Sequence, residues 1–403
     1  MKKREICTKN TYPRGAPDIH TGFFLVAYCI IFDTGLAVLS TGAILPDIIR
    51  EFNINYDMAG LFLSLQAIGN MSSTAVIGYL SEFIGRKAML LSGSLMIAAG
   101  FLGLAFAPSS KILFVLIFVS GCGWGINNII SGIINDITGA SASHLGRLHI
   151  FFAAGALAAP FLSIFAGAAG MGWRHVCGMI GLMALCAAVL LTFIKIPKAK
   201  KQKIGTSVSF KAFAHARYYI FLAIAFTYTA VETAMNGWIT TYFQATGILG
   251  EFQAKTALSM VWASIMAGRI IMSIVGDKIK KEHMILVCSI AVLAFSAIFI
   301  QLSSFAAILA CIFALGLGLS AVIPTNIANS EIVVQGSGAA LGVLLSFGGL
   351  GAAAGPLVTG IAAKHMGLSA SMWVSVGFAF VLLVMALINF LCANLKKKEG
   401  KKS

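Results

Sequence analysis

The sequence predicts an all-α membrane protein with twelve transmembrane helices in two six-helix, pseudo-symmetric bundles. Of its 403 residues, 59% are hydrophobic and 11% are charged, and the mean hydropathy is +0.91. Soluble domains carry roughly 25% charged residues, so this chain lacks the residues for a conventional water-exposed surface. Its apolar segments exceed the ~18 residues of a membrane-crossing helix, and they lack the alternation of barrel strands. Helices also satisfy their own backbone hydrogen bonds, which lipid cannot do.

The apolar segments follow one another along the chain with short polar breaks. They cover residues 22–45, 57–80, 88–108, 112–135, 147–170, 175–194, 218–243, 254–276, 284–303, 305–330, 338–363 and 369–393. These bounds predict five regions: an N-terminal cytoplasmic tail (1–21), a first bundle (22–194), a basic cytoplasmic linker (195–217), a second bundle (218–393) and a C-terminal cytoplasmic tail (394–403). The linker is either a solvated connection or a contact with lipid headgroups.

An internal repeat supports the division into two bundles. The stretch GYLSEFIGRK from Gly78 matches SIVGDKIKKE from Ser273, and GALAAP from Gly155 matches GAAAGP from Gly351. Both matches have nearly the same offset along the chain. Many transporters are built from such repeats, with the substrate site between them near the middle of the membrane.

Basic residues are distributed unevenly between the two sides that the spans define. The side of both termini and the linker holds 23 of the 29 Lys and Arg residues, and the other side holds five. Because positively charged loops stay in the cytoplasm, we expect both termini inside a bacterial inner membrane, in a multi-pass cell-membrane protein. The net charge of +15 therefore reflects topology and does not indicate nucleic-acid binding.

Several sequence stretches resemble the major facilitator superfamily. GYLSEFIGRKAML, from Gly78, looks like the family's loop signature between its second and third helices, with Glu82 where the family usually has Asp. The resemblance implies alternating access and a cytoplasmic gate in this loop and its repeat. The gate residues it implies are Gly78, Glu82, Gly85, Arg86, Asp277 and Lys281.

A narrower resemblance is to the fucose permease and bacterial glucose permease branch. It rests on AFTYTAVETAMNGWITTYF, MAGRIIMSIVGD, GCGWGINNIISG and RLHIFFAAGALAAP, which resemble the seventh, eighth, fourth and fifth helices of that branch. The branch often has an acid in the fourth helix, where this chain has Asn128. The acid that this branch has in its first helix aligns near Gly42 and not at Asp33. The resemblance therefore does not imply the complete set of proton-coupling residues of the branch.

Polar residues at spacings of three, four or seven share helix faces and predict a cavity between the bundles. Neutral polar side chains also join membrane helices by hydrogen bonds, and Trp often serves for packing, so each stripe has this structural alternative. The cavity candidates are Gln66, Asn70, Asn127, Asn128, Asn135, Tyr228, Asn236, Trp238, Trp262, Asn326 and Asn329.

Ionisable residues inside apolar segments are costly and commonly functional. Asp33, Glu232, Arg269 and His149 are the candidates for proton coupling. Burial favours the neutral form of a carboxyl, so one that faces alternate sides can carry a proton. The alternatives are a structural Glu232–Arg269 ion pair, a cytoplasmic position for Asp33, and a loop hydrogen bond for His149.

The leading hypothesis is a secondary transporter that imports a small polar solute, such as a sugar, with a proton. The alternatives are proton-driven efflux of drugs or metabolites and a non-transporting sensor. No catalytic motif, metal site or CxxC pattern occurs, and the eight cysteines fit buried small hydrophobes. We expect no enzymatic activity and no cofactor beyond the proton gradient. The expected partners are a small-molecule substrate and the lipid bilayer, with a functional monomer.

Overall fold

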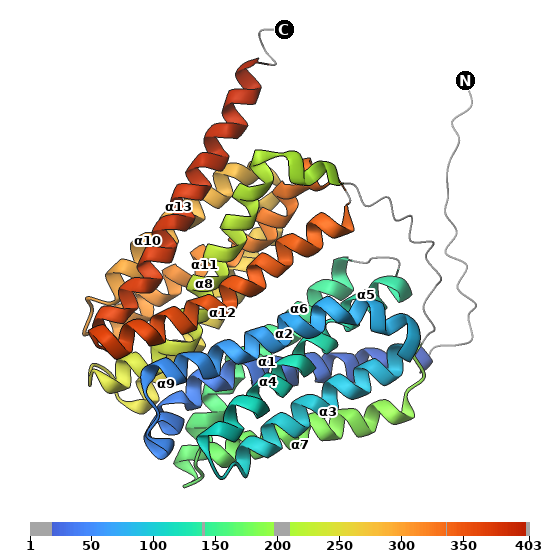
Figure 1. The fold of residues 1–403 in the computed structure, drawn as a ribbon, viewed down its shortest axis with the longest axis vertical. Coiled ribbons are helices and arrows are strands. Elements are labelled where there is room, and N and C mark those ends of the chain that lie inside the picture. The colour runs from blue at the N-terminus through green and yellow to red at the C-terminus, as the bar shows by residue number, and fades with distance from the viewer. Residues whose placement is uncertain (1–17, 139–141, 197–209, 336, 400–403) are drawn as a thin grey trace.

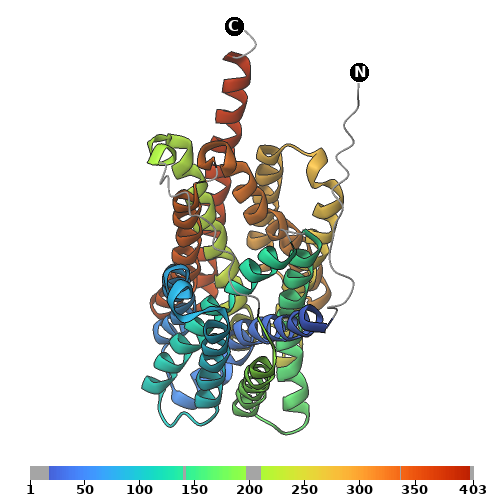
Figure 2. The ribbon, with the colours of Figure 1, turned by 90° about the vertical axis from the view of Figure 1, so that its right-hand side faces the viewer.

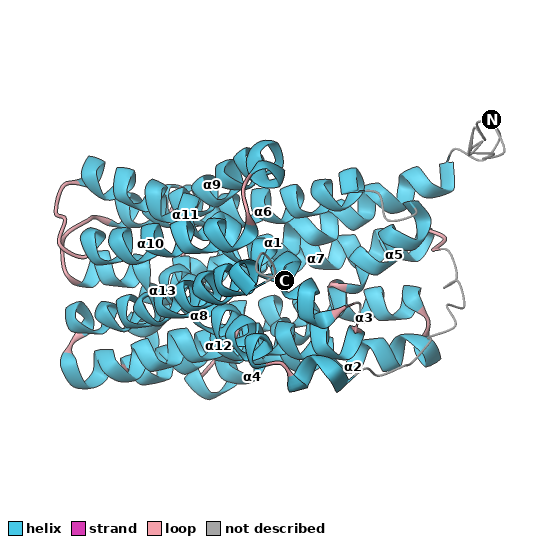
Figure 3. Cartoon of the chain, turned by 90° about the horizontal axis from the view of Figure 1, so that it is seen from above, coloured by secondary structure: helices cyan, strands magenta, loops and turns pink. Residues whose placement is uncertain are grey.

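The computed structural model describes residues 18–138, 142–196, 210–335 and 337–399. Every regular element in these ranges is a helix (Figure 3). The first half contains α1 (Asp18–Phe52), α2 (Tyr56–Ile84), α3 (Arg86–Ala105), α4 (Ser110–Asn127), α5 (Ile129–Thr138), α6 (Ala142–Ala168) and α7 (Trp173–Phe193). The second contains η1 (Phe210–Ala214), α8 (Ala216–Ala245), α9 (Glu251–Val275), η2 (Gly276–Lys278), α10 (Lys281–Phe299), α11 (Phe305–Val334), α12 (Gly338–Met366) and α13 (Leu368–Glu399).

Within the described ranges, 12 stretches of helix are long and apolar enough to cross a membrane, which confirms the predicted fold class. The fourth predicted span, 112–135, differs from the prediction because it consists of two helices, α4 and α5. Between them the backbone N–H of Asn128 donates to the Gly125 carbonyl three residues earlier (3.3 Å), which is the 3₁₀ pattern and not the α-helical one. The chain therefore breaks and restarts at Asn128 inside the membrane-spanning stretch.

The helices form two groups that follow the order of the chain. In Figure 1 the blue-to-green helices α1–α7 make one bundle, and the yellow-green-to-red helices α8–α13 make the other. In the perpendicular view of Figure 2 the first group lies mainly in the lower part and the second mainly in the upper part. Within the bundles, α1 packs against α6, and α8 packs against α12.

Small residues at repeat-related positions let these helix pairs approach closely. A side chain at Gly155 would clash with the Phe32 carbonyl oxygen, and one at Gly351 would clash with the Phe226 carbonyl oxygen. Gly155 and Gly351 are the residues that begin the repeated stretches GALAAP and GAAAGP. The internal repeat in the sequence thus corresponds to the same helix–helix contact in both bundles.

Three helix pairs join the two bundles: α2 with α12, α6 with α9, and α1 with α8. In Figure 1 the bundles meet near the start of α2 and the end of α12, and they separate toward the end of α7 and the start of α8. We call the first region the closed end and the second the linker side. The interface is therefore asymmetric along the helix axes.

Packing at the closed end is tight. The Asp57 carboxylate accepts a hydrogen bond from Lys364 across the bundles (2.7 Å). Gly60 and Gly360 lie so close that a side chain on either would meet backbone atoms of the other bundle. Farther inside, Ser64 donates to the Ala353 carbonyl (2.6 Å).

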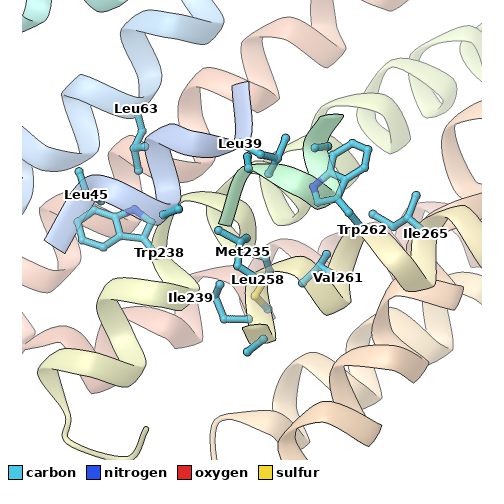
Figure 4. Packing of buried hydrophobic residues seen from close by; sticks show 14 of the residues in the cluster. Leu39, Leu45, Leu63, Met235, Trp238, Ile239, Leu258, Val261, Trp262 and Ile265 are labelled. Atoms are coloured by element: carbon cyan, nitrogen blue, oxygen red, sulfur yellow. The ribbon is translucent and has the colours of Figure 1, made fainter. Parts of the chain in front are cut away.

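An apolar cluster continues the interface inward from the closed end. Leu45 of α1 and Leu63 of α2 lie beside Trp238 of α8, and Leu39 approaches Trp262 of α9 (Figure 4). All five residues are buried. The core of this protein is therefore shared by the two bundles, and it ends where the central cavity begins.

Candidate functional site

A cavity of about 230 Å³ lies between the bundles. Its walls come from α1, α2, α4 and α6 on one side and from α8, α9 and α12 on the other. The lining residues are Val38, Leu39, Thr41, Leu63, Gln66, Ala67, Trp124, Phe152, Glu232, Thr233, Asn236, Gly237, Trp262, Arg269, Ala352 and Pro356. Most of this surface is apolar, so its few polar groups determine what it can recognise.

Glu232 is the carboxylic acid of the cavity wall, and it lies half-buried in the middle of α8. Its Oε1 accepts a hydrogen bond from the hydroxyl of Tyr228, one helical turn earlier (3.1 Å). Tyr228 itself is buried and does not line the cavity. It therefore orients Glu232 from behind, while Glu232 presents its carboxyl to the cavity.

Arg269 of α9 is the second charged residue of the wall. It interacts electrostatically with Glu232 and, across the bundle interface, with His149 of α6. No ion pair within 4.0 Å joins it to Glu232, and it makes no hydrogen bond to any residue that the structure describes. The hypothesis of a direct Glu232–Arg269 ion pair is therefore not realised in this conformation, and the nearest partner of Glu232 is Tyr228.

Neutral polar residues complete the polar part of the cavity in two pairs. Asn236 of α8 accepts a hydrogen bond from the indole of Trp262 of α9 (3.2 Å). Gln66 of α2 accepts one from Thr41 of α1 (3.3 Å) and donates to the Ala37 carbonyl (3.3 Å). Each pair links two helices and leaves further hydrogen-bonding capacity facing the cavity.

Three aromatic rings form one wall of the cavity. Phe152 lies 5.7 Å from Trp262 and 6.5 Å from Trp124, measured between ring centroids. Of these three residues, only Trp262 was predicted from the sequence to line the cavity. Trp124 and Phe152 lie beside predicted residues in the stretches GCGWGINNIISG and RLHIFFAAGALAAP. Trp124 lies four residues before Asn128 and Phe152 three residues after His149, so helical spacing places both rings on faces that hold predicted residues. The stripes were drawn from polar residues, and these two aromatic residues were therefore not included.

Several predicted cavity residues lie elsewhere. Trp238 is completely buried, and its indole donates to the Pro356 carbonyl (3.0 Å), so it serves in packing. Asn326 is also buried and donates to the Phe221 carbonyl (3.0 Å). Asn329 is buried within the second bundle. The prediction that these three line the cavity is wrong for this conformation, because their faces of α8 and α11 pack against neighbouring helices.

The asparagines of the first bundle also lie outside the cavity lining. Asn127 is buried and donates to Thr34 of α1 (3.3 Å), while Asn128 donates to Thr74 of α2 (3.5 Å). Asn70 and Asn135, on α2 and α5, each keep a buried side-chain atom without a partner. Interhelical hydrogen bonding, the alternative for these stripes, is what Asn127 and Asn128 provide.

Asp33 is separated from the cavity by its own helix. It is 2% exposed, and its Oδ1 has no hydrogen-bond partner among the described residues. Gly42 lies two and a half turns farther along α1 and packs against the Asn236 carbonyl of α8. Asp33 therefore points to the opposite side of α1, into the first bundle.

The predicted gate is described only in part. The surroundings of Gly78 and the side chains of Glu82 and Asp277 lie outside what the structure describes. Gly85 has a φ of 82°, which favours glycine. Arg86 forms an ion pair with Asp136 of α5. Its repeat counterpart Lys281 donates instead to the Ala328 carbonyl of α11 (2.8 Å).

Asp136 was not among the gate residues predicted from the sequence. Its position relative to Glu331 repeats the offset between Arg86 and Lys281, so the repeat itself contained the signal. The ion pair joins α3 to α5 near the linker side of the first bundle. It fastens the short helix that follows the break at Asn128.

Comparisons with known proteins agree with this architecture. A family model described as the Major Facilitator Superfamily matches residues 23–334 and 253–403. The TsgA homologue of Edwardsiella ictaluri is 24% identical over 364 residues, covering 88% of this chain and 91% of that protein. The glucose/mannose transporter GlcP of Bacillus subtilis is 21% identical over 336 residues, covering 78% and 81%.

The fold of this chain is also similar to the folds of solved transporter structures. The crystal structure of the nucleoside transporter NupG has a TM-score of 0.75 at 14% identity, covering 93% of this chain and 98% of that one. A bacterial homologue of the human lysosomal transporter Spinster, in an inward-facing and unoccupied conformation, has a TM-score of 0.76 at 14% identity, covering 94% and 98%. At this identity the likeness concerns the fold alone.

Proposed function

The chain belongs to the major facilitator superfamily of transporters, and on this premise we propose that it imports a small polar solute together with a proton. It is a multi-pass membrane protein and not an enzyme. The observation that carries the proposal is the cavity between the bundles, which contains one carboxyl group, Glu232. In alternating access, such a cavity opens first to one side of the membrane and then to the other.

The dimensions and walls of the cavity suit a sugar-like solute. Its volume of about 230 Å³ is below the range of roughly 300–1,000 Å³ that drug-sized ligands occupy. Gln66 and Asn236 offer donors and acceptors for hydroxyl groups, and the rings of Trp124 and Trp262 suit the apolar face of a sugar. The relative GlcP is a glucose/mannose transporter, which supports the same class of solute.

We assign the coupling proton to Glu232. A carboxyl in an apolar cavity favours its neutral form, and access to the opposite side lets the proton leave. Asp33 is the second carboxyl inside an apolar helix, but it points away from the cavity. It thus remains the alternative proton carrier, and the energy source in both cases is the proton gradient.

The orientation in the membrane is part of the proposal. With both termini in the cytoplasm, the contact between Asp57 and Lys364 closes the extracellular side. The cavity then faces the cytoplasm, so this conformation is the one that releases an imported solute. The protein acts in the bacterial inner membrane, and we propose that one chain is the functional unit.

Export of drugs or metabolites is the competing function. Uptake into proteoliposomes that contain the purified protein, under an imposed proton gradient, separates the two for a panel of sugars and cationic drugs. We expect a sugar-like solute to accumulate with inward proton flow. Drug movement against the proton flow, without uptake of any polar solute, would contradict import and support the antiporter.

A further inference from the structure

The guanidinium of Arg269 differs from the other arginines that the structure places among packed helices. Arg174 donates to Glu51 and to the carbonyls of Ala105 and Ala107, and Arg217 donates twice to Asn389. Arg269, in contrast, has no hydrogen bond or ion pair with a described residue although it lines an apolar cavity. Arg269 therefore contributes unpaired N–H donors to the cavity wall.

Glu232 interacts with this group electrostatically but forms no hydrogen bond with it, so the N–H donors of Arg269 are available to a bound solute. Arg keeps its positive charge at physiological pH, and a charge in an apolar site is unfavourable unless it is paired. The planar fork of a guanidinium matches a carboxylate with two parallel hydrogen bonds. An arginine without a hydrogen-bond partner among the described residues, in a cavity of about 230 Å³, thus favours a small ligand with a carboxylate.

The charge balance of the cavity connects this ligand to the proton. Glu232 and Arg269 are the charged residues among those that line it, so their charges cancel when both are ionised. A proton on Glu232 leaves the cavity with the single positive charge of Arg269. Protonation of Glu232 and binding of an anion therefore favour each other.

We propose that the transported solute is a monoanionic sugar acid whose carboxylate binds Arg269 while Glu232 carries the co-transported proton. This rests on the proposed function, proton-coupled import, and specifies its substrate class. Asn236 and Gln66 serve the hydroxyl groups, and Trp262 covers the apolar face of the sugar. The groups that face Glu232 are Tyr228 on its own helix and Arg269 on α9, and Arg269 also interacts electrostatically with His149 of α6.

The proposal has a measurable electrical consequence. One monoanion and one proton cross together with no net charge, so a pH gradient drives uptake and a membrane potential alone does not. Import of a neutral sugar with a proton moves one positive charge, so a potential that is negative inside drives it. The two substrate classes therefore differ in their driving force as well as in their chemistry.

The test uses proteoliposomes with the full-length protein and matched pairs of solutes, such as gluconate or glucuronate against glucose, and galacturonate against galactose. A pH gradient and a valinomycin-clamped potassium potential are applied separately. We expect an acid to accumulate under the pH gradient and not under the potential. Accumulation of a neutral sugar under the potential overturns the sugar-acid inference but supports the proposed function. Efflux of drugs alone overturns both.

Binding supplies a readout that does not depend on transport. Trp124 and Trp262 line the cavity, so quenching of intrinsic fluorescence reports occupancy in detergent. We expect Arg269→Gln to weaken acid binding by about tenfold or more and Arg269→Lys to weaken it less, because a charge-assisted pair is lost or altered. Arg147→Gln, at an exposed arginine of α6 outside the cavity lining, is the control. If no acid binds the wild-type protein more tightly than its neutral counterpart, the inference is overturned.

Discussion

The two bundles have the same internal packing but bring different chemistry to the cavity between them. Gly155 and Gly351 make equivalent close contacts, with the Phe32 and Phe226 carbonyls. The first bundle nevertheless lines the cavity with neutral residues, whereas the second supplies the charged Glu232 and Arg269. The repeat thus preserves the helix contacts that shape a bundle and leaves the cavity-facing positions free to differ.

The carboxyls Asp33 and Glu232 illustrate the same difference. Each is an acid within a long apolar helix, but Asp33 faces the interior of its bundle and Glu232 faces the cavity. If the residue that carries the coupling proton must line the cavity, that residue lies in the second bundle. The following substitutions test that division between the bundles.

Glu232→Gln is expected to have the largest effect. Proton-driven accumulation should fall to passive equilibration, because the amide cannot carry a proton, while exchange of solute across the membrane persists. Counterflow and driven uptake are measured in the same proteoliposomes. Asp33→Asn is the matched variant and should retain driven uptake. The reverse pattern would assign the coupling proton to the first bundle.

Removal of the linker-side ion pair should distinguish the bundles in stability. Arg86→Gln leaves the Asp136 carboxylate without its counterion, whereas Lys281→Gln removes an exposed hydrogen bond to a carbonyl and leaves no charge unpaired. We expect a larger fall in thermal unfolding temperature for Arg86→Gln, measured in detergent. The double variant with Asp136→Asn should recover part of the loss. Equal effects at Arg86 and Lys281 would remove this difference between the halves.

The packing glycines should instead behave alike. Gly155→Val and Gly351→Val each force a side chain against a backbone carbonyl, and overpacking of this kind costs about 1–3 kcal/mol. We expect similar decreases in thermal stability, with Gly132→Val as the control because open space surrounds that position. A decrease at one glycine and not at the other contradicts equivalent packing in the two bundles.

The smallest effects should come from the aromatic wall. Trp262→Phe removes the hydrogen bond to Asn236, so we expect solute affinity to fall about fivefold, as the loss of ~1 kcal/mol implies. Trp124→Phe keeps a ring in the first bundle's part of the wall and should change affinity by less than about twofold. Fluorescence is unsuitable for these variants, so competition with radiolabelled solute provides the affinities. A larger loss for Trp124→Phe would assign recognition mainly to the first bundle.

Helical spacing predicted which polar residues share a face of a helix. Some of these faces line the cavity, and others pack against neighbouring helices. Gln66, Asn236 and Trp262 reached the cavity, whereas Trp238 packed against α12. The side chain of Asn326 donates a hydrogen bond to a backbone carbonyl of α8. The spacing of residues along one helix does not specify how that helix is rotated relative to its neighbours. This rotation decides whether a residue lines the cavity or is buried between helices.

The sequence by itself determined the fold class, the number of spans, the repeat and the presence of Glu232 and Arg269 in apolar helices. These follow from composition, segment length and local spacing, which lipid constrains strongly. Only the tertiary structure decided that Tyr228 is the neighbour of Glu232, that Arg86 pairs with Asp136, and that Asp33 lies apart from the cavity. The physical reason is that such contacts depend on how helices rotate and pack against one another, and packing is a property of all twelve spans together.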